Sequence, residues 1–478
     1  STHYKLYAHY NDKGVDIVEL FNKNLEKEER KPLSAFIKTL EDLKKISDFR
    51  LLNETSLQGV LTGFGINVNY ISTIYKLYAH YKDKGVDIVD LFNKNLEKEE
   101  KKPLSAFIKT LDGLKKISDF KLLNETNLES VLTGFGVSVH YISTHYKLYA
   151  HYKDKGVGIV ELFNKNLEKE ERKPLSAFIK TLEDLKKISD FRLLNETSLQ
   201  GVLTGFGINV RYISTHYKLY AHYKDKGVDI VDLFNINLER GEGGPLVAFI
   251  QTMDELKKIS DSGLLKEANL EGVLRGFGIY VRYISTEYKI YTFWKGQGFD
   301  IAREFDRVYE ERIKGGKVRP STIVYELRDR LLERGLGLPE GKFSMDLAFY
   351  IRTILVSLGK IDITKRIRVL FEKEEDLVTM PSSRILEFYM DMHNVFPQDS
   401  LEMKVIELLV NDFTLEEVRK KLNIKEDEFE DILSNLRKKL YLYLKTGYYA
   451  DLGEDNITEK ATPPISKKLT STVRPTDL

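Results

Sequence analysis

Hydrophobic residues recur at helical spacing along most of the chain, and this pattern predicts short helices joined by tight loops. In the first copy of the pattern, helices are expected over 2–13, 16–30 and 32–46, with a fourth from Ser56. Pro32 suits a helix start because its missing N–H is not needed there. No segment alternates apolar and polar residues as a half-buried strand does. The sequence therefore predicts an all-α fold.

The same pattern returns every 71 residues through the first 284 positions. The tetrapeptide Tyr-Ile-Ser-Thr places its serine at 72, 143, 214 and 285, so each step is 71 residues (143 − 72, 214 − 143 and 285 − 214). Near-identical copies at a fixed period are typical of proteins built from stacked helical units. The sequence therefore predicts tandem helical repeats that arose by recent duplication.

The junction between successive copies has the residue spacing of a helix-turn-helix. Thr55 and Gln58 form a capping-box pattern that predicts a helix start. Gly65 permits the left-handed turn that follows, and a second helix is expected from Val68. In DNA-binding proteins of this kind the second helix enters the major groove. The positions expected to be buried are Leu57, Val60, Leu61, Phe64, Ile71, Tyr75 and Tyr78.

Because the predicted helix-turn-helix spans the junction, its second helix is shared with the next copy. We therefore divide the chain into units that each end in a helix-turn-helix. Residues 1–14 then form a second helix without an upstream partner, which suggests a longer repeat array. The predicted divisions are 15–85, 86–156, 157–227 and 228–298 for the repeats, 299–370 for a divergent fifth repeat, 371–400 for a connector, 401–448 for a C-terminal module and 449–478 for a flexible tail.

The C-terminal module has a different helical pattern. Its key stretches are Val405-Ile406-Glu407-Leu408, Thr414-Leu415-Glu416-Glu417-Val418, Leu422-Asn423-Ile424 and Leu436-Arg437-Lys438-Lys439-Leu440. These stretches resemble region 4 of bacterial sigma factors and the related LuxR-type helix-turn-helix. The resemblance implies three helices that bind DNA, or that contact RNA polymerase or another protein. Five acidic residues between 426 and 431 open its second helix and would repel phosphate, so a protein contact has at least as much support there as a DNA contact.

The exposed side of each repeat's second helix carries residues that suit DNA contacts. Asn and Arg can bond to base edges, whereas Ser, Thr and Lys suit phosphates. The copies differ on this face, where Asn69 is replaced by His140, Arg211 and Arg282. The predicted nucleic-acid-binding residues are Asn67, Asn69, Ser72, Thr73 and Lys76; Ser138, His140, Ser143, Thr144 and Lys147; Asn209, Arg211, Ser214, Thr215 and Lys218; and Arg282, Ser285, Thr286 and Lys289.

Charge and packing leave a second interpretation open. The chain has 74 Lys and Arg against 73 Asp and Glu, a net charge of +1, so any nucleic-acid contact must come from local patches. Position 74 should be partly buried in a helix-turn-helix, yet the later copies place His145, His216 and Glu287 there. The same helices could instead stack into a scaffold that binds protein or assembles with itself.

Neither the composition nor the order of residues indicates a catalytic or metal-binding site. The chain has no cysteine, and no apolar run approaches the roughly 20 residues that a membrane span needs, so we expect a cytoplasmic protein with no membrane partner. His140, His145 and His151 are five and six residues apart and do not converge on a metal. We therefore expect no enzyme and no cofactor. The favoured function is binding of double-stranded DNA in transcription regulation or mobile-element maintenance.

Overall fold

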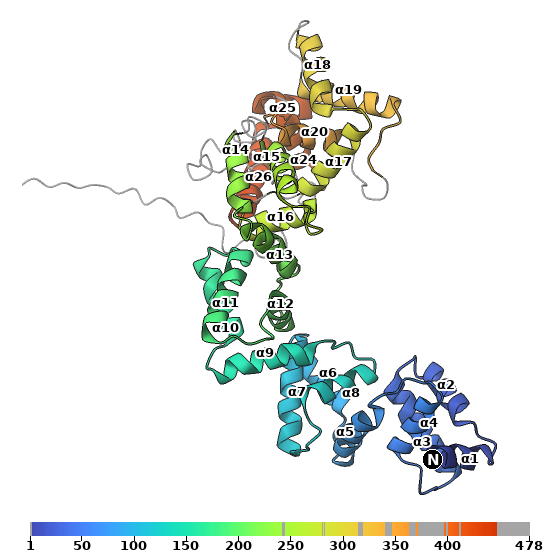
Figure 1. Cartoon of the computed structure of the whole chain (residues 1–478). Helices are drawn as coiled ribbons and strands as arrows, with labels where there is room; N and C mark the ends of the chain where they lie inside the picture. The colour runs from blue at the N-terminus through green and yellow to red at the C-terminus, as the bar shows by residue number, and fades with distance from the viewer. Residues whose placement is uncertain are drawn as a thin grey trace, which may run out of the picture. The chain divides into compact units, whose positions relative to one another are not determined.

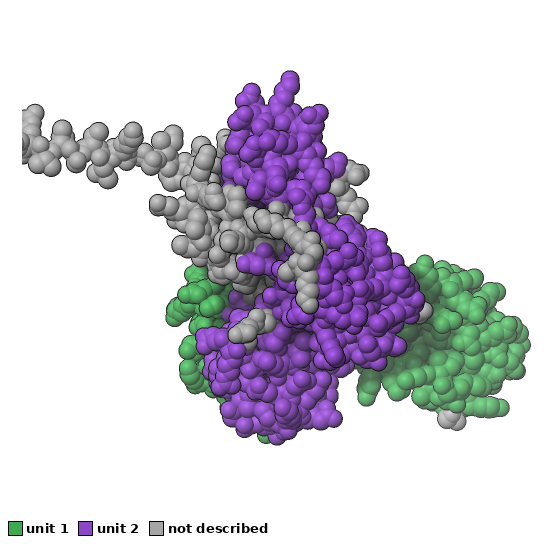
Figure 2. Space-filling view, turned by 90° about the horizontal axis from the view of Figure 1, so that it is seen from above, with its two compact units in different colours: residues 1–218 green, residues 219–478 purple. Residues whose placement is uncertain are grey.

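A computed structural model describes residues 2–240, 244–279, 281, 283–313, 319–339, 347–362, 370, 396–397, 400–410 and 413–446. Every regular element in these residues is a helix, which confirms the predicted all-α fold (Figure 1). The chain divides into two compact units, residues 1–218 and 219–478, which Figure 2 colours separately. None of the described helices is long and apolar enough to cross a membrane.

In the first unit, four helices recur in each 71-residue stretch. Asp16 caps the second of them, because its side chain accepts hydrogen bonds from the backbone N–H groups of Val18 and Glu19. Pro32 is the first residue of the third. The helices are α1 (Thr2–Asn11), α2 (Ile17–Lys27), α3 (Pro32–Ile46), α4 (Glu54–Gly63), α5 (Ile71–Asp83), α6 (Ile88–Lys98), α7 (Pro103–Ile117), α8 (Glu125–Gly134), α9 (Ile142–Asp154), α10 (Ile159–Lys169), α11 (Pro174–Ile188) and α12 (Glu196–Gly205).

The second and third helices of each copy pack side by side around a buried polar chain, as α10 and α11 do in Figure 1. In the first copy the Asn24 side-chain amide donates to Thr39 Oγ1 over 3.1 Å, and that hydroxyl donates to the Ala35 carbonyl over 2.8 Å. Both side chains are buried. The Asn24 amide, the Thr39 hydroxyl and the Ala35 carbonyl are hydrogen-bonded in series. The contact therefore fixes how α2 lies on α3 without leaving these buried groups unsatisfied.

A fully buried tyrosine ties the first helix of each copy to the third. Tyr10 donates its hydroxyl to the carbonyls of Leu43 and Ser47, at 3.1 and 2.9 Å, and so joins α1 to the end of α3, where the Leu43 carbonyl also accepts the Ser47 N–H. His9 Nε2 lies 2.9 Å from Ser47 Oγ. Helix α1 also packs on α4. The helix predicted within residues 1–14 is therefore held by the first copy.

Helix α5 shows that these first helices are shared between copies. Towards the following copy, the buried Tyr81 donates to the Ser118 carbonyl over 2.9 Å. Towards the preceding copy, the ring of Tyr75 meets that of Phe36 edge-on at 6.2 Å between centroids. One helix thus contributes to two successive cores, and the array has no natural break at Ser72.

Successive copies also touch where two glycines end the fourth helix. A Cβ built at Gly134 would lie 2.8 Å from Leu33 Cβ, and one at Gly136 would lie 2.9 Å from Lys31 Cε. The next pair repeats this contact, since a Cβ at Gly205 would lie 2.6 Å from Leu104 Cβ. We call the Gly-Phe-Gly segments 63–65, 134–136 and 205–207 the stacking sockets. The Lys-Pro-Leu segments 31–33 and 102–104 are the helix starts that cover the second and third sockets.

The fourth helix does not begin where the sequence pattern predicts. Thr55 is not its cap: Asn53 accepts a hydrogen bond from the Ser56 N–H over 2.8 Å, and the Ser56 hydroxyl accepts one from the Asn53 N–H over 3.0 Å. This reciprocal pair is a capping box shifted two residues towards the N-terminus, so α4 begins at Glu54. Phe64, predicted to be buried, is 54% exposed.

The second unit continues the repeat and then diverges. Helices α18 to α20 occupy the predicted fifth repeat, while most of the connector (371–400) and the whole tail (449–478) lie outside the described residues. The helices are α13 (Ile213–Lys224), which spans the division between the units, α14 (Ile230–Arg240), α15 (Gly244–Ile259), α16 (Glu267–Gly276), α17 (Ile284–Gly296), α18 (Ile301–Ile313), α19 (Pro320–Glu333), α20 (Leu347–Ser357), α24 (Leu401–Val410), α25 (Leu415–Leu422) and α26 (Glu426–Thr446).

A close contact at the equivalent place persists in the second unit, with different residues. Gly244 stands where the first copy has Lys31, and a Cβ built there would lie 2.7 Å from the Ser357 carbonyl oxygen. Ser357 and Gly359 end α20 in the place of the two socket glycines, and Gly359 has a φ of 72°. Glycine in place of the lysine thus keeps the close approach, although serine replaces the first of the two socket glycines.

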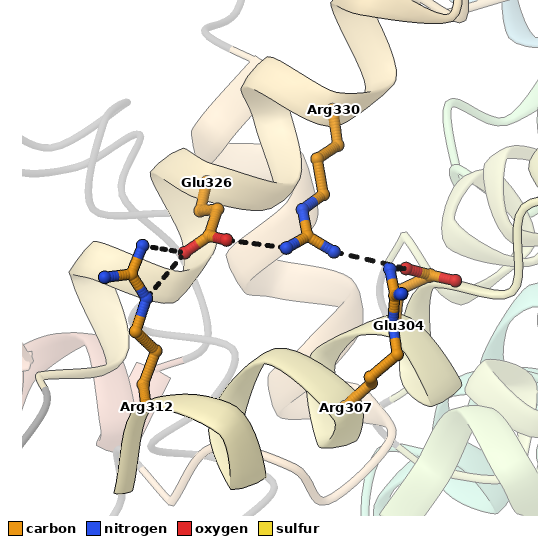
Figure 3. A network of polar contacts seen from close by, with 5 residues as sticks. All are labelled: Glu304, Arg307, Arg312, Glu326 and Arg330. Atoms are coloured by element: carbon orange, nitrogen blue, oxygen red, sulfur yellow. Dashed lines mark hydrogen bonds and ion pairs between the residues drawn. The ribbon is translucent and has the colours of Figure 1, made fainter. Parts of the chain in front are cut away.

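An ion-pair network joins α18 to α19 (Figure 3). Glu326 accepts hydrogen bonds from Arg330 and Arg312, at 2.7 and 3.0 Å, while Arg330 and Arg307 reach Glu304. Burial would raise the pKa of Glu326, but the two arginine bonds outweigh it and hold that pKa below its usual value. The arginine-rich stretch of the fifth repeat is therefore engaged in holding its own helices together.

A buried acid lies in the core of the second unit. Glu287 is 2% exposed, and burial raises the pKa of its carboxyl to about 8. The nearby Ser357 hydroxyl opposes this rise, although neither Glu287 oxygen has a partner of good hydrogen-bond geometry among the described residues. The negative charge of Glu271 adds to the rise. The acid is therefore mostly protonated at neutral pH.

We predict that the same glycine substitution has opposite effects in two copies. Gly205→Ala should lower stability by about 1–3 kcal/mol, because its methyl group overlaps Leu104. Gly63→Ala should be neutral or stabilising by up to about 1 kcal/mol, because nothing described lies within 4 Å of a Cβ there and alanine favours the helix. Thermal unfolding of both variants measures the difference. Equal shifts would contradict the stacking contact.

We also predict a pH-dependent contribution from Glu287. Its folded pKa exceeds the unfolded value of 4.5, so its contribution to stability is full below about pH 4.5, declines as the pH rises, and levels off above about 8. Glu287→Gln should remove this component from urea unfolding curves collected between those values. Glu310 is exposed, so Glu310→Gln serves as the control. Its free energy of unfolding should decline with rising pH as that of the wild type does. A decline unchanged in the Glu287 variant would refute the assignment.

Candidate functional site

The predicted base-reading residues lie in a loop, not on a helix. Helix α5 begins at Ile71 rather than Val68, because Tyr70 adopts a left-handed backbone with a φ of 65°. Asn67 and Asn69 therefore precede the helix, and both are exposed. Seven residues separate α4 from α5, more than the three or four of a DNA-binding helix-turn-helix. We call residues 67–70, 138–141 and 209–212 the junction loops.

The other predicted residues divide by exposure. Apart from Ser138, which is exposed in its loop, the serines and threonines are half-buried at the helix starts, and the lysines are exposed. Arg282 lies outside the described residues. The exposed loop residues are Asn67, Asn69, Ser138, His140, Asn209 and Arg211; the half-buried residues are Ser72, Thr73, Ser143, Thr144, Ser214, Thr215, Ser285 and Thr286; and the exposed helix residues are Lys76, Lys147, Lys218 and Lys289.

Each predicted phosphate-binding lysine already has an acidic partner. Lys76 Nζ lies 3.4 Å from Glu54 Oε1, and Glu54 is the first residue of the preceding helix. The pairs Lys147–Glu125, Lys218–Glu196 and Lys289–Glu267 repeat this arrangement at 3.4, 3.3 and 3.0 Å. Such exposed pairs add little stability. They do cancel the local positive charge that phosphate binding would use.

The start of the second helix is also occupied. The backbone N–H of Ser72 donates to Gln58 Oε1 over 2.9 Å, so a side chain from α4 caps α5. Glu129 caps Ser143 in the same way over 2.7 Å. Gln200 and Glu271 do so for Ser214 and Ser285, at 2.7 and 2.9 Å. In two copies, therefore, a carboxylate sits where a phosphate would have to approach.

The structure identifies a candidate binding residue that the sequence pattern did not predict, the tyrosine at the end of each junction loop. Tyr70, Tyr141 and Tyr212 are 76%, 74% and 69% exposed. Each has a φ between 64° and 66°, a conformation that costs a non-glycine residue of the order of 1–3 kcal/mol. A ring so exposed gains little from packing. The one hint in the sequence was that the tyrosine persists in every copy while the residue before it changes.

Packing explains why two copies carry a histidine at the position of Ile74. A Cβ built at Gly201 would overlap the imidazole ring of His145, and one at Gly59 would overlap the ring of His3. Each histidine thus fills the space that a glycine of α12 or α4 leaves open. Burial lowers the pKa of His145, which favours the neutral ring. These histidines serve packing between helices.

The C-terminal module has three helices in the predicted places. Thr414 and Glu417 form a capping box at the start of α25, and Asn423 takes the left-handed conformation at its end with a φ of 54°. The first turn of α26 exposes Glu426, Asp427 and Glu428. Acidic residues favour the positive end of a helix, but they repel phosphate. DNA or polymerase binding by this module stays a prediction.

Comparison with known proteins identifies no relative of this chain. No family model, curated protein or solved structure matches this chain. The resemblance of the C-terminal module to sigma-factor region 4 therefore rests on its own residues. Any functional assignment depends on the junction loops and the helices around them.

We predict that the cap between α4 and α5 stabilises the junction. Gln58→Ala should cost about 0.5–2 kcal/mol, because the Ser72 N–H loses its acceptor. Gln58→Glu is the matched control and should be tolerated, since Glu129 makes the same bond in the next copy. Urea unfolding of the three proteins tests this. Equal stability of the wild type and the alanine variant would contradict the capping role.

Proposed function

We propose that the chain is a helical-repeat scaffold that binds protein through its junction loops. The observation that carries this proposal is the set of exposed tyrosines on strained backbone, Tyr70, Tyr141 and Tyr212. Backbone strain that packing does not explain is typical of functional sites. Tyrosine suits a protein interface because it offers a large, rigid surface with a hydroxyl at its tip.

The residues beside the tyrosines support a role in recognition. Asn69, His140 and Arg211 each precede a junction-loop tyrosine and are exposed. A constant aromatic anchor next to a changing polar residue lets successive loops contact different positions of one partner. Arginine and tyrosine are also the residues that most often dominate binding energy at protein interfaces.

DNA binding remains the competing prediction, and the charge arrangement supports it less. Each junction presents its lysine together with a glutamate, so the pair is neutral overall. Non-specific DNA binding depends on unpaired positive charge that can replace the counterions of the phosphates. The acidic start of α26 supports a protein contact for the C-terminal module on the same grounds.

We predict that two sets of substitutions separate the alternatives. Replacing Tyr70, Tyr141 and Tyr212 with glycine should abolish capture of the bound protein from nuclease-treated extract. The same change should leave the melting temperature equal or higher, because glycine adopts a positive φ without strain. Replacing Lys76, Lys147 and Lys218 with alanine should leave capture intact. Cross-linking with mass spectrometry of the captured protein reads out the result.

The DNA arm of the experiment uses mixed duplex DNA in gel shifts at about 50 and 200 mM salt. The scaffold proposal expects no shift that depends on the three lysines. The opposite outcome is a duplex complex that weakens steeply with salt, is lost in the lysine variants and is kept in the tyrosine variants. That outcome would favour DNA binding over the scaffold proposal.

A further inference from the structure

The first stacking socket differs from the others in being uncovered. Among the described residues, nothing lies within 4 Å of a Cβ built at Gly63 or Gly65. At the equivalent glycines, 134 and 205, the same Cβ would meet a leucine at 2.8 and 2.6 Å. Phe64, at the centre of the first socket, is 54% exposed, whereas Phe135 is half-buried.

The uncovered socket already has the shape of a covered one. The ring of Tyr7 supports Phe64 at 4.9 Å between centroids, and Tyr78 supports Phe135 at the same distance. The backbone agrees too, with a φ of 80° at Gly65 and 79° at Gly136. An occupant would therefore find the site formed before it binds, which lowers the cost of association.

The chain itself shows which kind of segment fits this surface. In the second and third copies the covering segment is Lys-Pro-Leu at a helix start, with the leucine over one glycine and the lysine stem over the other. The lysine brings its own counter-ion, since Lys31 Nζ pairs with Glu29 at 3.1 Å. The socket thus needs no charge, and it selects its occupant by close fit of a leucine onto glycine.

We propose that the surface of Gly63, Phe64 and Gly65 binds the third-helix start of one further 71-residue repeat. The occupant carries Lys-Pro-Leu in the place of residues 31–33 and repeats the contact of Leu33 with Gly134. The socket ends one residue before junction loop 67–70, but filling it does not cover that loop: in the second copy Gly134 meets Leu33 while Tyr141 stays 74% exposed.

The test adds one repeat to the full chain. A second copy of residues 1–71 placed ahead of Ser1 brings the added Lys31–Leu33 segment against the original Gly63–Gly65. The chain has no cysteine, so Phe64→Cys supplies a single thiol at the socket. We expect thiol labelling there to slow by about tenfold or more in the extended chain. Phe135→Cys in the natural chain provides the rate for a covered socket.

The matched control is Gly63→Ala in the original copy. It should be harmless in the natural chain, where the socket is open. In the extended chain its methyl group should overlap the added Leu33, restore fast labelling of the introduced thiol and lower the melting temperature. Labelling that stays fast in the extended chain overturns the proposal, as does equal tolerance of Gly63→Ala in both chains. An added copy that remains unfolded by circular dichroism overturns it as well.

Discussion

The contact between a leucine and a helix-ending glycine sets how closely successive copies can approach. A Cβ at Gly134 or Gly205 would lie within 2.8 Å of a leucine Cβ, a separation that real side chains do not reach. The close fit lets the third helix of one copy rest on the fourth helix of the next. The second unit supports this view: Gly244 replaces the lysine and Ser357 replaces the first glycine, and the close approach is preserved.

The shared first helix makes these contacts cooperative. Tyr81 satisfies a carbonyl of the following copy, while Tyr75 packs on Phe36 of the preceding one. Loosening α5 therefore exposes apolar surface on both sides, and the stability of neighbouring copies is coupled as in other stacked repeats. This is the physical reason why the array has no clean boundary at either Ser72 or Gly85.

Local patterns in the sequence predicted the helices well but missed contacts between them. The apolar spacing identified α1 to α4, and Pro32 was rightly placed at the start of α3. The cap was assigned to Thr55 because Thr and Gln match a capping box, although Asn53 and Ser56 form the real one.

The candidate site was predicted less well for the same reason. Asn69 and Lys76 are exposed, as the sequence predicted. However, Asn69 lies in a loop rather than on a helix, and Lys76 is paired with Glu54. That pair joins residues 22 positions apart, and the Gln58–Ser72 cap joins residues 14 apart. Periodicity along one helix holds no information on partners in another.

Two kinds of difference between the near-identical copies can be told apart. Some follow packing: His3 faces Gly59 and His145 faces Gly201, whereas the second copy's register sets Ile74 opposite Ser130. A large ring is matched by a glycine, so these positions change together for steric reasons. Asn69, His140 and Arg211 are exposed and meet no such constraint. Packing does not account for their variation, and the tyrosine beside each one stays the same on strained backbone. The junction loops are thus one place where differences between copies reach the solvent, and the proposed scaffold function would use these differences to contact different parts of a partner.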